Sequence, residues 1–381
     1  MTRPFLAKVS DHESSGVHLC QGVYPLDDAP RTLRVKPGRG FGADRALRQC
    51  INPSTPTGCF PSAGSRFAAQ FEARAPRRAN ISHVARAEVN FVSGSDRCVA
   101  WSYRPDGGGP HPLVVMAHGF SGTRELRLDA YADRFCAEGI GAFVFDYRFF
   151  GASGGRPRQV VDIAAQLDDW RQAVSFARGI PWADPARVAL FGTSFSGGHV
   201  VCIGAEDPKI AAIVAQCPFQ NGLATARKLG LLAAVLLGGH GLVDQAAALL
   251  GLPPHYIPAV AAAGHVGLMT TPDAKTGFEA LVPEHTLWEN RVAARIALRI
   301  VTYRPGAKAP KVQAPTLWCL ADHDSLCPAD DAAKWAASAP RGEVLRYPIG
   351  HFDFYVGDWF ERALADQVQF LKRHLLAEQV D

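Results

Sequence analysis

A serine at the junction of a strand-like run and a helix-like run is the first candidate for chemistry in this chain. It is Ser194 in LFGTSFSGGH (190–199), with Gly192 two places ahead. A serine at a strand–turn–helix bend needs small neighbours, because strand and helix approach closely there. Its hydroxyl is exposed above the sheet, and the helix N-terminus favours developing negative charge. The stretch alone is a weak signal, so a base, an acid and an oxyanion site must be found elsewhere.

The candidate base is His351 in YPIGHFDFY, which follows the last predicted strand. Serine is a poor nucleophile until a base takes its proton. Loops that leave the carboxyl ends of parallel strands lie at one edge of the sheet, where such sheets bind ligands. His351 is therefore expected on the same edge as Ser194.

The acid that orients this histidine is expected after the preceding strand, where ADHDSLCP (321–328) offers Asp322 and Asp324. We choose Asp324, because Pro328 four places later suits a loop that opens a helix, and we assign Asp322 to a turn at the strand end. Its carboxylate would fix the imidazole tautomer and stabilise the imidazolium. A metal site at Asp322-His323-Asp324 is disfavoured, because no further cluster completes a ligand shell. We expect neither a metal nor a cofactor.

The loop AHGFSGT (117–123) is the candidate oxyanion site. Backbone N–H groups must point at the oxygen that becomes negative in a tetrahedral intermediate. The N–H groups of Phe120 and Phe195 are the two expected donors. His118 is expected to shape this loop by hydrogen bonding and not to act as the base.

The elements that must position these residues alternate between buried strands and helices. Near-continuous apolar strand runs predict a mostly parallel sheet covered by helices on both faces, an α/β fold. Two alternating segments near residue 90 predict an antiparallel pair. The strands are expected at 87–93, 97–105, 112–117, 140–148, 187–192, 210–219, 315–322 and 342–348, and the helices at 124–139, 160–179, 196–207, from about 328, and 360–376.

The chain divides into four parts. Residues 1–82 are rich in Pro, Gly, Ser and Arg without apolar periodicity, so we expect a disordered or non-native N-terminal extension. Residues 83–218 and 301–381 form the two parts of one core. Residues 219–300, rich in Ala, Leu and Gly, are expected to form a mostly helical lid whose runs LGLLAAVLLGG (229–239) and LVDQAAALLGL (242–252) roof the serine.

The charge distribution and the cysteine spacing limit the classes of partner and the cellular location that we expect. The net charge is +4, but residues 1–85 hold 12 Lys and Arg against 6 Asp and Glu, which leaves −2 for the rest and no hint of a nucleic-acid partner. Nine scattered cysteines without a CxxC pair indicate reduced thiols and a cytoplasmic location. The start has no apolar signal-peptide region, and the most apolar run is too short to span a bilayer. The oligomeric state stays open, with a homodimer as one option.

In combination, these motifs resemble the α/β-hydrolase superfamily. The matching stretches are HGF (118–120), FDYRFFGASGG (145–155), DPARVALFGTSFSGG (184–198), ADHDSLCP (321–328) and GHFDF (350–354), which occur in the family's order over roughly residues 87–378. The resemblance implies an eight-stranded, mostly parallel sheet, a lid inserted after the sixth strand and cofactor-free acyl transfer to water. Ser196 replaces the usual second glycine of the serine motif, a mild departure.

Within the superfamily the chain resembles dienelactone hydrolases and the cocaine-esterase and X-Pro-peptidase branch, with two departures. Dienelactone hydrolases use cysteine where this chain has Ser194. The X-Pro peptidases and cocaine esterase carry an oxyanion tyrosine after the third strand, and HGFSGTRE contains none.

We therefore expect a serine hydrolase that cleaves a carboxylic ester or thioester through Ser194, Asp324 and His351. Its substrate is expected to be a small molecule with a hydrophobic portion. Peptidase, C–C hydrolase or acyltransferase activity with the same triad is the alternative. A binding protein on a retired hydrolase scaffold is the rival from another class.

Overall fold

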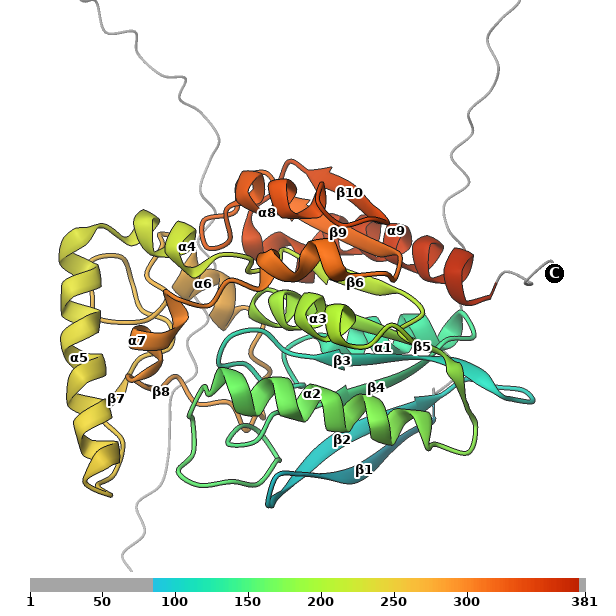
Figure 1. Cartoon of the computed structure of the whole chain (residues 1–381), viewed down its shortest axis with the longest axis horizontal. Helices are drawn as coiled ribbons and strands as arrows, with labels where there is room; N and C mark the ends of the chain where they lie inside the picture. The colour runs from blue at the N-terminus through green and yellow to red at the C-terminus, as the bar shows by residue number, and fades with distance from the viewer. Residues whose placement is uncertain (1–84, 377–381) are drawn as a thin grey trace, which may run out of the picture. The chain divides into compact units, whose positions relative to one another are not determined.

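The computed structural model describes residues 85–376. Its centre is an eight-stranded sheet in the order β1-β2-β4-β3-β5-β6-β9-β10 (Figure 1). β2 pairs antiparallel with β1 and β4, and the other neighbouring strands are parallel. The predicted α/β fold with a mostly parallel sheet is confirmed, whereas the prediction for residues 1–82 lies outside the described residues. The strands are β1 (Ala85–Ser93), β2 (Asp96–Arg104), β3 (His111–Ala117), β4 (Gly141–Phe145), β5 (Ala183–Thr193), β6 (Ile213–Gln216), β9 (Thr316–Ala321) and β10 (Gly342–Tyr347).

The central strands have no polar face. Every residue of β3 and β4 is buried, because helices cover the sheet on both sides. The hairpin of β1 and β2 lies at one edge and keeps polar, exposed positions. This difference in burial is why the sequence shows continuous apolar runs in β3 and β4 and alternation in β1 and β2.

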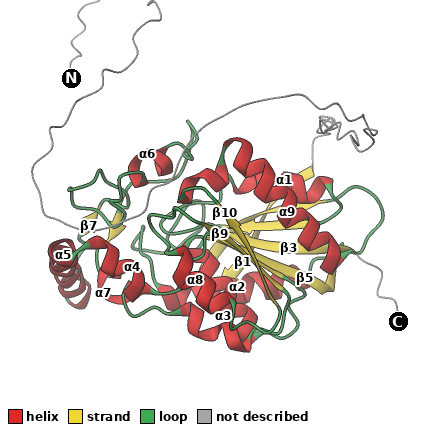
Figure 2. Ribbon diagram, turned by 90° about the horizontal axis from the view of Figure 1, so that it is seen from above, coloured by secondary structure: helices red, strands yellow, loops and turns green. Residues whose placement is uncertain are grey.

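The helices form two layers. Figure 2 shows α1 and α9 on one face of the sheet and α2, α3 and α8 on the other. Asp162 caps α2 by accepting the Ala165 N–H at 3.1 Å. Helix α1 begins later than predicted, at Leu128, because Arg127 has a φ of 69° and interrupts the helical path. The five helices are α1 (Leu128–Ala137), α2 (Ile163–Arg178), α3 (Phe195–Glu206), α8 (Ala329–Ala336) and α9 (Gly357–Leu375).

Residues 219–300, here called the inserted segment, leave the sheet after β6 and lie at one end of it (Figure 1). The segment is less helical than predicted, because β7 and β8 pair antiparallel and long irregular stretches connect the helices. It contains α4 (Gly222–Leu229), α5 (Leu231–Leu249), β7 (Tyr256–Ile257), α6 (Ala274–Glu279), β8 (Val292–Ala293) and α7 (Ile296–Ile300). Short 3-10 helices follow at Pro305–Lys311 and His351–Tyr355.

Candidate active site

Ser194 lies between the end of β5 and the first residue of α3, in a strained backbone conformation with φ 56° and ψ −120°. Its N–H donates to the Gln216 carbonyl of β6, and its carbonyl accepts the Phe219 N–H, both at 2.9 Å. A Cβ at Gly192 would collide with the Ser196 carbonyl, so this position requires glycine. Backbone strain of this kind persists only where the surroundings hold it, and it occurs often at active sites.

The structure accounts for Ser196 in place of the usual second glycine. The Ser196 side chain is small and fully buried, and the close contact between the elbow and its neighbours occurs at the next residue. A Cβ at Gly197 would lie 2.7 Å from the Pro218 side chain. Serine is therefore tolerated at 196, whereas 192 and 197 are glycine.

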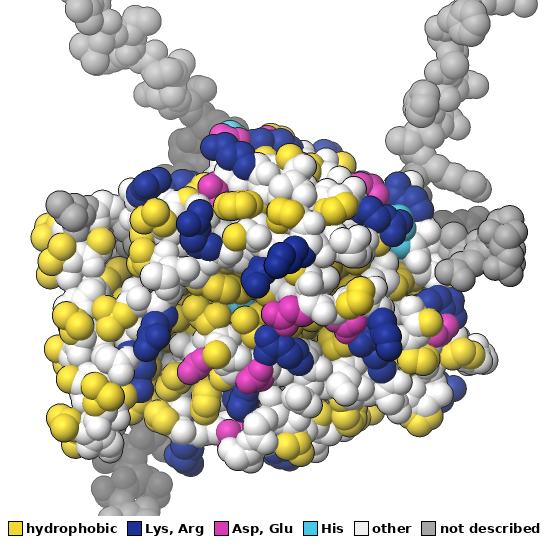
Figure 3. All heavy atoms as spheres, in the orientation of Figure 1, with side chains coloured by type: hydrophobic (Ala, Val, Ile, Leu, Met, Phe, Trp, Pro, Cys, Tyr) yellow, Lys and Arg dark blue, Asp and Glu magenta, His cyan; other side chains and the backbone are white. Residues whose placement is uncertain are grey.

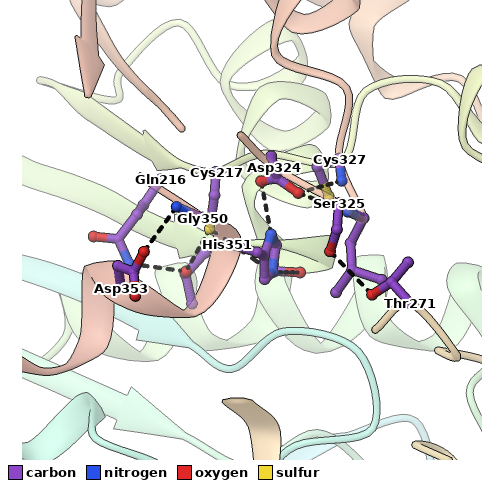
Figure 4. A network of polar contacts seen from close by, with 12 residues as sticks. Gln216, Cys217, Thr271, Asp324, Ser325, Cys327, Gly350, His351 and Asp353 are labelled. Atoms are coloured by element: carbon purple, nitrogen blue, oxygen red, sulfur yellow. Dashed lines mark hydrogen bonds and ion pairs between the residues drawn. The ribbon is translucent and has the colours of Figure 1, made fainter. Parts of the chain in front are cut away.

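The structure brings Ser194, His351 and Asp324 together. The Nε2 of His351 lies 3.1 Å from the Ser194 Oγ, and its Nδ1 lies 2.7 Å from the Asp324 Oδ2. The other Asp324 oxygen accepts the N–H groups of Leu326 at 2.8 Å and Cys327 at 2.6 Å. Figure 4 shows His351 beside Asp324, with Cys327 on the far side of the carboxylate. Asp322 is directed elsewhere and pairs with Arg346 at 2.6 Å.

The surroundings of His351 act on the pKa of its imidazole in opposite directions. Burial disfavours the charged form, but the Asp324 carboxylate and the Cys217 sulfur outweigh it and raise the pKa of His351 well above its usual value. The ligand atoms of Cys217, Asp324 and His351 all lie within 4.8 Å of one another, which is metal-ligand spacing. The His351 Nδ1 and the Asp324 carboxylate nevertheless form a hydrogen bond with each other. This contact is typical of a proton-transfer arrangement and not of two ligands of one metal ion.

The loop after β3 lies directly against the serine. A Cβ on Gly119 would be 3.0 Å from the Ser194 Cβ and 3.5 Å from its Oγ. The rings of Phe120 and Phe195 meet edge to face with centroids 5.5 Å apart. Both candidate oxyanion donors therefore belong to segments that flank Ser194.

His118 bonds its own loop, as predicted. Its Nδ1 donates to the Gly119 carbonyl at 2.9 Å, and burial lowers the pKa of its imidazole to about 4. The ring is therefore neutral at pH 7. Behind it, buried Asp146 accepts the Arg124 N–H at 2.7 Å and the Ala152 N–H at 3.1 Å, which ties the loops after β3 and β4 together.

A cavity of about 40 Å³ opens beside Ser194 and His351. Among the described residues that line it, none is acidic or a lysine or arginine. Its walls come from the core and from the inserted segment. The apolar side chains around it include Leu126, Leu128, Met269, Phe278, Leu281 and Phe352.

The prediction named the wrong residues for the roof over the serine. The runs 229–239 and 242–252 fall mostly in α5, which stands at the outer margin of the molecule and does not line the cavity (Figure 1). Met269, Phe278 and Leu281 take that place instead, from irregular chain and short α6. Trp288 packs on Phe278 and donates to the Ser121 carbonyl at 2.9 Å, so it joins the inserted segment to the core.

Contacts from the inserted segment reach the loop that carries Asp324. The Lys228 Nζ donates to the Asp324 carbonyl at 2.8 Å. The Thr271 Oγ1 lies 3.0 Å from the Ser325 Oγ. Figure 4 shows these two side chains directed toward each other. On the opposite side, Glu125 accepts the Thr286 hydroxyl at 2.8 Å and the Leu287 N–H at 2.9 Å.

Two residues beside Ser194 and His351 were not identified from the sequence. The Cys217 Sγ lies 4.0 Å from the His351 Nε2 (Figure 4), and the Tyr355 hydroxyl lies 2.5 Å from the Thr193 Oγ1. Cys217 directly follows β6, the strand beside the one that leads into Ser194. Its position at a strand end could therefore have predicted a place near the site. Tyr355 lies four residues after His351 among aromatic neighbours, which is equally typical of core packing.

A mostly parallel eight-stranded sheet with a strained serine between strand and helix defines an α/β hydrolase, a class of enzyme that acts on esters or similar substrates. The model of the family described as "Serine aminopeptidase, S33" matches residues 108–348, so the chain belongs to this family of α/β-hydrolase enzymes. The expected superfamily of serine hydrolases is thereby confirmed.

Relatives carry several different names. The chain is 44% identical over 286 residues, 75% of its length and 94% of the relative, to "Quorum-quenching protein AidA" of Acinetobacter baumannii. It is 26% identical over 270 residues, 69% of its length and 88% of the relative, to "Polyketide transferase grgF" of Penicillium sp.. The crystal structure of the α/β hydrolase GrgF from Penicillium sp. sh18 matches with a TM-score of 0.64 at 23% identity, covering 77% of this chain and all of that one.

Proposed function

We propose that the chain hydrolyses a carboxylic ester or thioester through an acyl-enzyme. Ser194 attacks the carbonyl while His351 takes its proton and later returns it to the leaving group. Asp324 orients His351, and the N–H groups of Phe120 and Phe195 bind the oxyanion. Water then releases the acyl group from Ser194. The observation that carries the proposal is the chain of contacts at 3.1 and 2.7 Å from serine to imidazole to carboxylate.

The walls of the cavity support a substrate with an apolar acyl group. Met269, Phe278 and Leu281 face it from the inserted segment, which we propose acts as a lid. Recognition of a free α-amine, as in an aminopeptidase, would require a negative partner, and the described lining contains no acidic side chain. The relative named as a quorum-quenching protein makes lactones, which are cyclic esters, a class of substrates to test.

Covalent labelling tests the nucleophile. A fluorophosphonate probe is expected to modify Ser194, with mass spectrometry locating the adduct, and p-nitrophenyl acyl esters are expected to give a burst of p-nitrophenol. Ser194→Ala should abolish both signals. Ser196→Ala is the matched control, because its hydroxyl is buried two residues away and does not take part in the contacts between Ser194, His351 and Asp324. Labelling that survives in Ser194→Ala would refute the assignment.

Acyl transfer to an acceptor other than water is the second candidate, favoured by the relatives named polyketide transferase. The same acyl-enzyme would then pass its acyl group to an alcohol or carbon nucleophile. Product analysis separates the two. Free acid should dominate over acyl transfer to added alcohols if the chain is a hydrolase. A panel that includes an amide and a β-diketone tests peptidase and C–C hydrolase activity in the same experiment.

A further inference from the structure

The outer face of α5 is apolar and exposed. Figure 3 shows hydrophobic side chains along the margin of the molecule where α5 lies in Figure 1. The large side chains on this face are each between 51% and 80% exposed. We call this face, which extends one residue beyond the helix, the α5 stripe; its large members are Leu232, Val235, Leu236, Leu242, Val243, Leu249 and Leu250.

The stripe has the spacing of a helix that packs along another helix. Three series repeat every seven residues, and together they give the apolar period of about 3.5 residues found in coiled-coil seams. Smaller residues complete the first series. The series are Leu232, Gly239 and Ala246; Val235, Leu242 and Leu249; and Leu236, Val243 and Leu250.

The opposite face of α5 is already packed. Leu237 is buried, and a Cβ on Gly241 would lie 2.9 Å from Leu298 of α7. Buried Asp244 pairs with Arg295 at 2.7 Å. The expectation that the most apolar run is too short to span a bilayer considered residues 229–239 alone. The window Leu232–Leu249 is long and apolar enough by composition, but a span would have to give up this ion pair. The packing therefore fixes α5 with its stripe outward.

Two glycines at the middle of α5 have no explanation within the described residues. A Cβ on Gly238 or Gly239 would meet no atom within 4 Å. Glycine inside a helix costs about 0.5–1 kcal/mol relative to alanine. Close approach of a second backbone would account for Gly239, which lies within the stripe between its large side chains.

We propose that the α5 stripe of one chain packs antiparallel against the α5 stripe of a second copy, about a two-fold axis near Gly239. A two-fold interface places the same surface on both sides, so a face without charges meets no like-charge repulsion. Eight large side chains, counting Leu252 at 56% exposed, contribute apolar area toward the about 800 Å² per partner that a stable interface buries. A helix that lies on a lipid surface carries Lys or Arg, and α5 contains neither.

Sedimentation velocity of the full chain between about 0.5 and 100 μM tests the proposal. The expected result is a dimer. The double variant Val235→Lys/Leu242→Lys places four cations in the interface and should raise the dimer Kd at least 100-fold. Val92→Lys is the matched control, because Val92 is 68% exposed on β1, outside the inserted segment. The dimer Kd of this variant should equal that of the wild-type chain. Circular dichroism checks that each variant is folded.

Cross-linking locates the axis. Gly239→Cys should form an intermolecular disulfide under copper–phenanthroline oxidation, above the background of the wild-type chain, whose six described cysteines are buried. A wild-type chain that stays monomeric at 100 μM overturns the proposal, and so does a dimer that the double lysine variant leaves intact. Monomers that sediment with phosphatidylcholine–phosphatidylglycerol vesicles through the stripe would assign it to lipid instead.

Discussion

Replacing Asp324 by asparagine is expected to remove most of the activity by changing the tautomer of His351. One carboxylate oxygen of Asp324 accepts two backbone N–H groups, at 2.8 and 2.6 Å. Only the carbonyl oxygen of an asparagine can accept them, so its NH₂ group must face the His351 Nδ1. A donor there stabilises the tautomer that carries its proton on Nε2. That nitrogen can then no longer take the proton of Ser194.

The size of the loss follows from this reversal. In Ser-His-Asp triads the wrong tautomer costs about 10⁴-fold in kcat, or about 5.5 kcal/mol at about 1.4 kcal/mol per decade. The fold should survive, because the amide has the same shape and keeps both backbone bonds. The measurement is steady-state hydrolysis of a p-nitrophenyl ester, with thermal unfolding as the check on folding.

Asp322→Asn is the matched control for this variant. Asp322 lies two residues earlier on the same loop, but its carboxylate pairs with Arg346 on the surface. Its kcat should stay within about twofold of wild type, because exposed ion pairs contribute little. A folded Asp324→Asn variant that keeps more than a tenth of the activity would refute the tautomer argument.

Three further outcomes are expected. The raised pKa of His351 means that kcat/KM should increase as pH rises through a midpoint above 6.5, because only the neutral imidazole accepts a proton; a rate unchanged down to pH 5.5 would contradict this. Gly277→Ala should lower stability by about 1–3 kcal/mol, since its Cβ would overlap the Phe352 ring, whereas Gly238→Ala should raise it by about 0.5–1 kcal/mol; thermal or urea unfolding of both variants measures the contrast. Glu125→Ala removes two hydrogen bonds to the inserted segment and should speed hydrogen exchange in the loop it holds, with β9 peptides unchanged as the reference.

The core of the site was predictable because each part follows a strand. Buried parallel strands show as apolar runs, and the residues after them share one edge of the sheet. Ser194 follows β5, Asp324 follows β9 and His351 follows β10, so their approach in space was implied by the order of elements. The choice between the two aspartates rested on Pro328, which directly precedes α8.

The wall over the serine was not predictable from pattern. Helix α5 has an apolar stripe that is typical of core packing, but local sequence does not show what a stripe faces. Met269, Phe278 and Leu281 line the cavity from a region without apolar periodicity, where tertiary contacts alone decide direction. The positions of Cys217 and Tyr355 beside the triad depend equally on neighbouring strands and turns.

Lys228 and Thr271 support the loop that carries Asp324, and both belong to the inserted segment that we propose acts as a lid. A movement that admits substrate would therefore withdraw these supports at the same moment. The loop that carries Asp324 would then be held less firmly, and attack would be faster after re-closure. Some acyl groups would be too bulky for Lys228 and Thr271 to regain their contacts with the Asp324 loop. Such substrates would react slowly even when they bind well. Discrimination by size would therefore show in kcat more than in KM.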